Sequence, residues 1–151
     1  MTLDEVSLDD IADRLNRGGA NYSVFLRLYR CSDERGPIDL DRALRLSMGN
    51  GVQVGGVEDL DVAAVAAEVD GMLRYGGDAN AGPDPQVLVS EEFRTLLAGL
   101  ADEVSALGKR ALAIKRFWLS SGHPAYPVFW DFAYAFLEER SATILIGSSS
   151  D

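Results

Sequence analysis

The sequence predicts a single α+β domain, spanning residues 1–151, in which N-terminal helices pack on one face of a C-terminal antiparallel β-sheet. Three observations support this fold class. A chain of 151 residues has the usual size of one domain. Apolar residues recur at helical spacing before Gly108 and alternate every second residue after it. Helical segments followed by strands are typical of the α+β class.

Four segments before Gly108 are predicted to be helical, because each combines apolar residues three or four positions apart with a capping residue or a terminating glycine. The clearest is 91–107, where Ser90 suits the N-cap and two glutamates suit the first turn. Ser7 is expected to cap the first helix, and Gly108 is expected to end the last. The predicted helices are 8–17, 39–48, about 60–75 and 91–107, and 52–54 is a predicted edge strand.

Residues 22–30 fit two patterns. Tyr22, Leu26 and Tyr29 recur at helical spacing, whereas Leu26 and Leu28 belong to an alternation that suits a strand. We interpret this segment as a helix, with a strand as the open alternative.

The last third of the chain is predicted to form strands at 110–119, 128–137 and 142–147. In 128–137, large aromatic residues alternate with mostly small ones. We expect the small-residue face to receive the helices. A helix over 128–139 is the competing interpretation, but the polar turn at 138–141 before another apolar run favours a hairpin.

The charge of the chain is strongly negative and unevenly placed. The net charge of −10 argues against nucleic acid as a direct ligand, because phosphate groups would be repelled. Eleven acidic residues lie between Glu58 and Gly108, against two bases. From Lys109 onward, four acids face five bases. The middle of the chain therefore carries the negative charge.

The composition indicates a cytoplasmic protein of bacterial origin. A single cysteine, Cys31, excludes an intramolecular disulfide and fits a reducing compartment. The N-terminus lacks the basic and apolar blocks of a signal peptide, and no segment has the roughly 20 apolar residues that a membrane helix needs. Twelve arginines against two lysines suggest a GC-rich bacterial genome. We expect no membrane partner.

His123 is the single histidine and the strongest candidate for chemistry. Histidine can act as a general base near neutral pH. A small hydrolase or ligand-binding enzyme would combine His123 with Ser121 as nucleophile and Asp131 as orienting acid. Residues two apart in a loop seldom give that geometry, and no nucleophile-elbow pattern is present. A structural role for His123 is therefore favoured.

Asp131 has a second interpretation. It lies within a predicted strand, where a buried carboxylate without a partner would be costly. Lys115 or Arg116 on the neighbouring strand is expected to pair with it across the sheet.

The sequence predicts no metal and no cofactor. One histidine and one cysteine leave zinc without its usual ligands. The loop 78–84 places polar groups at every second residue, as calcium loops do, but Pro83 and the absence of a glutamate in register favour a solvated loop. The glycine-rich turns match neither phosphate-binding fingerprint.

The favoured function is that of a non-enzymatic interaction protein whose acidic helices bind a basic protein partner. Taken alone, the acidic charge is explained more simply by solubility, because a net charge well away from zero keeps a small protein monomeric. Toxin-neutralising immunity proteins are the most concrete version, because an acidic surface steers a basic partner at high rate. A third alternative is a homo-oligomer whose copies cover the aromatic strands. The predicted partner-binding residues are Glu68, Asp70, Glu91, Glu92, Asp102 and Glu103.

Overall fold

The sheet of this protein draws strands from both halves of the chain. The computed structural model describes residues 5–78 and 80–151. Within them the elements follow in the order α1 (Glu5–Asn16), β1 (Ser23–Ser32), α2 (Leu40–Met48), β2 (Gln53–Asp59), α3 (Val62–Leu73), α4 (Pro85–Leu88), α5 (Glu91–Arg110), β3 (Ala113–Ser121), β4 (Trp130–Leu137) and β5 (Ser141–Ser150). The predicted α+β class is confirmed, with helices concentrated in the N-terminal half and the β3–β5 block in the C-terminal half.

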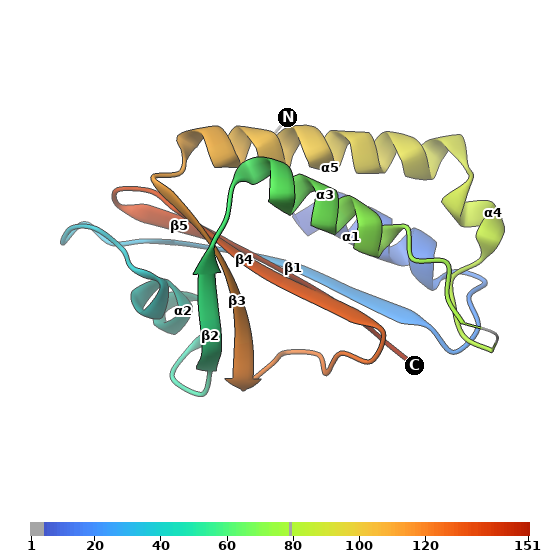
Figure 1. Cartoon of the computed structure of the whole chain (residues 1–151), viewed down its shortest axis with the longest axis horizontal. Helices are drawn as coiled ribbons and strands as arrows, with labels where there is room; N and C mark the ends of the chain where they lie inside the picture. Colours follow the sequence, from blue (N-terminus) through green and yellow to red (C-terminus); the bar gives the residue numbers. More distant parts are fainter. Residues whose placement is uncertain (1–4, 79) are drawn as a thin grey trace.

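The five strands form one antiparallel sheet in the order β1-β5-β4-β3-β2 (Figure 1). The hairpins β3–β4 and β4–β5 are local, as the sequence predicts. The pairing of β1 with β5 is not, because it sets Ser23 opposite Ser150. β1 and β2 therefore form the two edges of the sheet.

The interpretation of residues 22–30 as a helix is wrong, because this segment forms β1. Val24, Leu26 and Leu28 are each 7% exposed and lie in the same core cluster as the apolar side of α1. A short apolar run fits both periods, so the neighbouring β5 decides the conformation rather than the local pattern.

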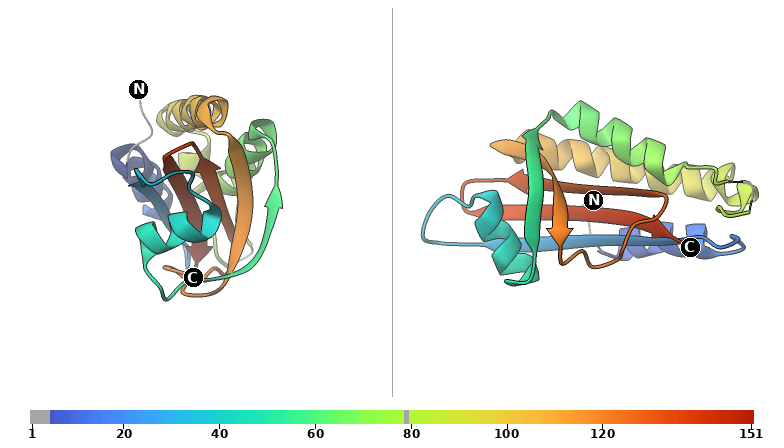
Figure 2. Two further views of the ribbon diagram at one scale, coloured as in Figure 1. Left: turned by 90° about the vertical axis from the view of Figure 1, so that its left-hand side faces the viewer. Right: turned by 60° about the horizontal axis from the view of Figure 1, so that its bottom comes forward.

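Three helices cover one face of the sheet, with α5 between α1 and α3 (Figures 1 and 2). This is the large-residue face of β4, because its aromatic side chains share a core with the helices. The expectation that the small-residue face receives these helices is wrong. Large rings fill the space between a sheet and the helix layer that packs on it. The rings are Trp130, Phe132, Tyr134 and Phe136.

The small-residue face of β4 is covered by α2 and by the sheet itself. Ala133 and Ala135 share a second core with Phe117 of β3 and with Leu44 of α2. Figure 2 shows the sheet curling, with β2 and β3 on one side and α2 across its end. Small side chains on β4 let these segments approach closely.

The helix caps agree with those predicted from the sequence, with two exceptions. Asp39, Asp61 and Ser90 act as N-caps, each accepting a backbone N–H of the first turn. Ser7 lies inside α1 rather than at its cap, since the helix already includes Glu5. Gly108 lies inside α5 and does not end it. Among the described residues, no helix combines the length and apolar character needed to cross a membrane.

Candidate partner-binding surface

The outer side of the helix layer carries exposed carboxylates from two helices that are far apart in sequence. The helices α1, α3 and α5 contain ten acidic residues and four basic ones. α1 and α5 pack against each other on the same face of the sheet (Figure 2), so their exposed acids belong to one helix layer. We call the exposed set the acidic helix face: Asp9, Asp10 and Asp13 of α1, with Glu91, Glu92 and Asp102 of α5.

The charge pattern of the sequence does not point to the acids of α1. The excess of acids over bases is largest in residues 58–108, and α1 lies outside that range. Nothing in the sequence shows that α1 packs beside α5, because that contact depends on β1 crossing to pair with β5. The run Asp9-Asp10 followed by Asp13 was the available signal, since all three project from one short helix.

The six predicted partner-binding residues divide into three environments. Glu91, Glu92 and Asp102 are exposed. Glu68 and Asp70 are half-buried on α3 and engaged in ion pairs. Glu103 is only 6% exposed, so its carboxylate lies within the layer rather than on its surface.

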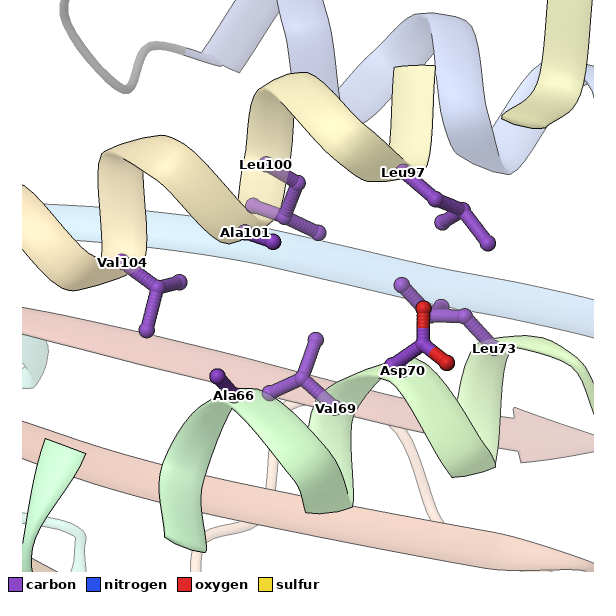
Figure 3. A pocket seen from close by; sticks show the side chains of 8 residues that line it. All are labelled: Ala66, Val69, Asp70, Leu73, Leu97, Leu100, Ala101 and Val104. Carbon is purple, nitrogen blue, oxygen red and sulfur yellow. The ribbon is translucent and has the colours of Figure 1, made fainter. Parts of the chain in front are cut away.

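Asp70 lies at the seam between α3 and α5. Its carboxylate accepts from Nε of Arg74 at 2.9 Å, one turn further along the helix. Figure 3 shows it beside apolar side chains from both helices. The seam holds only about 10 Å³ of open space, which is room for about one water molecule at most. It is a packing contact rather than a ligand pocket.

Glu68 belongs to an ion-pair cluster around Arg116. The guanidinium of Arg116 donates to Glu68 at 2.8 Å and to Glu58 at 2.6 Å, and so joins α3, β2 and β3. The hydroxyl of Tyr134 is buried beside this cluster. Burial raises the pKa of Tyr134, and the charge of Glu68 raises it further. Glu68 therefore has a structural role, because its ion pair with Arg116 links α3 to β3.

His123 is held by a backbone contact. Its Nδ1 atom accepts the amide N–H of Ala125 at 3.0 Å, so the neutral ring carries its proton on Nε2. Burial lowers the pKa of His123, and the charge of Asp131 opposes that shift. A catalytic relay needs the Nδ1 proton to point at the carboxylate, with Nε2 open to accept a proton. The observed hydrogen bond gives the opposite arrangement.

Ser121 and Asp131 lie on different strands. Ser121 ends β3, opposite Gln53, and its side chain is exposed. Asp131 pairs in register with Ser148 of β5 and is also exposed. The negative charge of Asp131 raises the pKa of His123, which lies in the loop between the two strands.

The expected pairing of Asp131 with Lys115 or Arg116 is wrong. The sheet register sets Lys115 opposite Ala135 and Arg116 opposite Tyr134. Lys115 instead forms an ion pair with Asp59 on the edge strand β2. Because Asp131 is exposed, water solvates its carboxylate and no cross-strand base is required.

The described residues of the polar loop 78–84 are held by backbone and capping hydrogen bonds. The amide of Asp78 donates to the carbonyl oxygen of Ala81 at 2.6 Å, and the carboxylate of Asp84 caps α4. Ala79 lies outside the described residues. Within residues 5–78 and 80–151, no three acidic, histidine or cysteine side chains come together as a metal site would require.

Comparisons with protein-family models, with curated proteins and with solved structures give no match to this chain.

Proposed function

We propose that this protein is a non-enzymatic interaction protein that binds a basic protein partner through the acidic helix face. The observation that carries this proposal is the convergence of exposed carboxylates from α1 and α5 on one layer, with ten acids and four bases over the three helices. Such a surface attracts a basic partner over a distance of about 8 Å at physiological ionic strength.

The chemistry of the surface suits association more than catalysis. Exposed carboxylates raise the rate of encounter and select against acidic proteins, while contributing modestly to final affinity. An inhibitor of the immunity type, acting on a basic toxin in the bacterial cytoplasm, is the concrete form of this proposal. The arginine-rich composition and the single cysteine support that setting.

The test compares two variants that change net charge equally. The face variant combines Asp9→Asn, Asp13→Asn, Glu91→Gln and Asp102→Asn. The control variant removes four exposed acids elsewhere, through Glu34→Gln, Asp41→Asn, Glu139→Gln and Asp151→Asn. Asp41 matches Glu91, because each lies in the first turn of a helix. Both variants carry a net charge four units less negative than the natural chain.

The partner is first identified by cross-linking and mass spectrometry in bacterial extract. The association rate constant between this partner and each variant is then measured. The face variant is expected to associate about tenfold more slowly at low ionic strength, and the control variant less than twofold. The rate for the natural chain should fall steeply with added salt. A partner with an acidic surface, or equal effects of the two variants, would contradict the proposal.

A further inference from the structure

We propose that the outer edge of β1 and the side of α1 above it bind an extended basic segment of the partner, which joins the sheet as a sixth strand. This inference rests on the proposed function, because it takes the partner to be basic, and it adds the conformation in which part of that partner binds. β1 pairs through all ten of its residues with β5 on one side, and no described strand borders its other side (Figure 2).

Asn16 shows which backbone groups of β1 face outward. Its side-chain oxygen accepts the N–H of Val24 at 2.7 Å, and its side-chain nitrogen approaches the carbonyl of Val24 at 3.4 Å. An amide side chain thus makes the two contacts that a neighbouring strand would make. Strand residues alternate between the two edges, so the backbone groups of Leu26 and Leu28 face the same way as those of Val24.

A contact just beyond the strand agrees with this alternation. The amide of Asp33 donates to the carbonyl of Arg140, in the turn that leads into β5. Odd-numbered positions therefore face β5, and even-numbered positions form the open edge. Leu26 and Leu28 hold that edge in place, because their side chains are only 7% exposed in the core shared with α1. Little ordering is then needed before a strand pairs with it.

The other edge of the sheet is built differently. β2 has two register shifts against β3 and carries Gly55 and Gly56, whose open surface is covered by the Trp118 ring. Bulges and short, irregular pairing are the usual means of blocking an edge strand. β1 has ten consecutive paired residues and no shift. The two edges therefore differ in their capacity to accept another strand.

Asn16 also shows which side of α1 lies over the open edge. Seven residues make about two turns of an α-helix, so Asp9 projects from the same side of α1 as Asn16, and Asp13 lies about 60° from it. Both aspartates are exposed, and neither forms an ion pair with another described residue. Arg14, the basic residue in the last turn of α1, lies about 160° around the helix from Asn16. The side of α1 above the edge is therefore acidic.

The two aspartates lie beside the part of the edge that is open. The end of α1 contacts Val24 near the start of β1, and α1 packs on β1, so the helix runs back along the strand (Figure 2). Two helical turns cover about 10 Å, which is about three strand residues, so Asp9 lies near Leu26 and Leu28. A residue paired opposite either leucine projects from the helix side of the sheet. A basic side chain there points toward the acidic side of α1.

The arginines of β1 do not select an acidic segment instead. Arg27 projects from the opposite face of the strand, where its guanidinium lies over the Tyr29 ring, 5.9 Å from the ring centre. Arg27 and Arg30 both have further interactions within the chain. Arg30 shares the helix side of β1, so a neutral residue is expected opposite it. The basic residues of the segment are therefore expected opposite Leu26 and Leu28.

A second copy of the chain fits this edge less well. Two copies paired through β1 would bring their α1 helices together on one face of the joined sheets. Asp9 and Asp13 of each copy would then lie close to those of the other, and each copy brings a net charge of −10. A basic segment replaces this repulsion by attraction.

The experiment uses two blocked peptides of seven residues that differ only in charge. Threonine occupies every odd position and valine position 2, and positions 4 and 6 are both lysine or both glutamate. Hydrogen exchange of the natural chain is followed by NMR for each backbone amide. With the lysine peptide at ten times its dissociation constant, exchange at Leu26 and Leu28 is expected to slow about tenfold. The glutamate peptide should bind about fivefold more weakly.

N-methylation separates strand pairing from general attraction between opposite charges. In the paired peptide the amides of the lysines face β1, whereas those of the threonines face solvent. A lysine peptide N-methylated on both lysines should give no protection, because it lacks the donors that pair. The same peptide N-methylated on the threonines at positions 3 and 5 has the same charge and should protect both leucines about as well as the unmodified peptide.

Asp9→Asn and Asp10→Asn are matched variants of the chain. Each removes one exposed carboxylate of α1, but Asp10 lies about 120° around the helix from Asn16. Asp9→Asn is expected to weaken binding of the lysine peptide about threefold, and Asp10→Asn by less than about 1.5-fold.

Equal binding of the two peptides, protection by the lysine-methylated peptide, equal effects of the two aspartate variants, or no protection at millimolar concentration would overturn the inference. Concentration-dependent protection of the same amides without peptide would assign the edge to a second copy instead. If Leu26 and Leu28 stay unprotected while the face variant still slows association of the partner, the inference at β1 fails and the proposed function stands.

Discussion

Two glycines in the sheet lie beneath aromatic rings. A side chain at Gly56 would overlap Cζ2 of Trp118, and one at Gly147 would overlap Cζ of Phe132. Each ring covers backbone that a glycine leaves bare, which is a known way of stabilising strand glycines. Trp118 therefore has a structural reason to lie on the sheet surface although it is 49% exposed.

At the residue scale, His123 makes stability depend on pH. Folding lowers its pKa below the ordinary value of 6.5, because the ring is partly buried. The unfolded chain then binds a proton more readily than the folded chain, so the free energy of unfolding falls as the pH drops below about 6.5. His123→Gln is expected to remove this contribution, measured by urea unfolding of both proteins from pH 8 to pH 5.

Asp131→Asn provides the companion measurement. The charge of Asp131 raises the pKa of His123, so its removal should lower that pKa further. NMR titration reports this directly, because the chain contains one histidine. A pKa above 6.5 in the natural chain, or an upward shift in the variant, would show that burial does not control this ring.

At the scale of elements, the crossing of α3 and α5 depends on Gly108. A Cβ at this position would overlap Val62 at the start of α3. Alanine is favoured over glycine in a helix by about 1 kcal/mol, so propensity and packing oppose each other here. We expect packing to dominate, and Gly108→Ala to lower the free energy of unfolding by about 1–3 kcal/mol.

Gly71→Ala is the matched control, because Gly71 lies in α3 with no atom near its missing side chain. It should stabilise the protein by about 0.5–1 kcal/mol in the same denaturant titration. Adding Val62→Ala should reduce the penalty of Gly108→Ala, because it removes the nearest atom, Cγ2, although the Cβ of residue 62 stays within 2.5 Å of the new side chain. If Gly108→Ala stabilises the natural chain, the two helices are not held together as closely as described.

Local pattern alone predicted α5 and the β4–β5 hairpin, and it failed at β1. α5 repeats its apolar stripe from Phe93 to Leu107, over about four turns, and the hairpin strands are neighbours in sequence. β1 has a pattern that suits two conformations, and its partner β5 lies more than a hundred residues away. The prediction of which sheet face the helices cover was wrong for the same reason. Alternation in β4 shows that two faces differ, but only the path of the chain shows what covers each.

At the scale of the whole molecule, charge is separated between layers. The three covering helices hold ten acids and four bases, whereas the five strands hold three acids and four bases. The composition predicted an acidic surface, and Glu91, Glu92 and Asp102 are exposed as expected. It could not predict the contribution of α1 or the burial of Glu103, since both depend on how the helices are arranged.

Repulsion within the acidic helix face should make stability sensitive to salt. Raising sodium chloride from 20 to 200 mM is expected to increase the free energy of unfolding by about 0.5–1 kcal/mol, because added ions screen the exposed carboxylates. The face variant should gain less than the control variant, although both have the same net charge. Thermal and urea unfolding at each salt concentration would measure this. Equal gains would mean that net charge matters and its placement does not.

The pairing of β1 with β5 has a consequence for synthesis. During synthesis β1 leaves the ribosome before β5, and it cannot join the sheet until β5 has emerged, because Ser23 and Ser150 are 127 residues apart. Closing so long a loop is slow, and strands that wait for distant partners are prone to aggregate. The nascent chain therefore exposes an apolar strand without its partner while the residues between β1 and β5 are synthesised, and chaperones have access to it during that time.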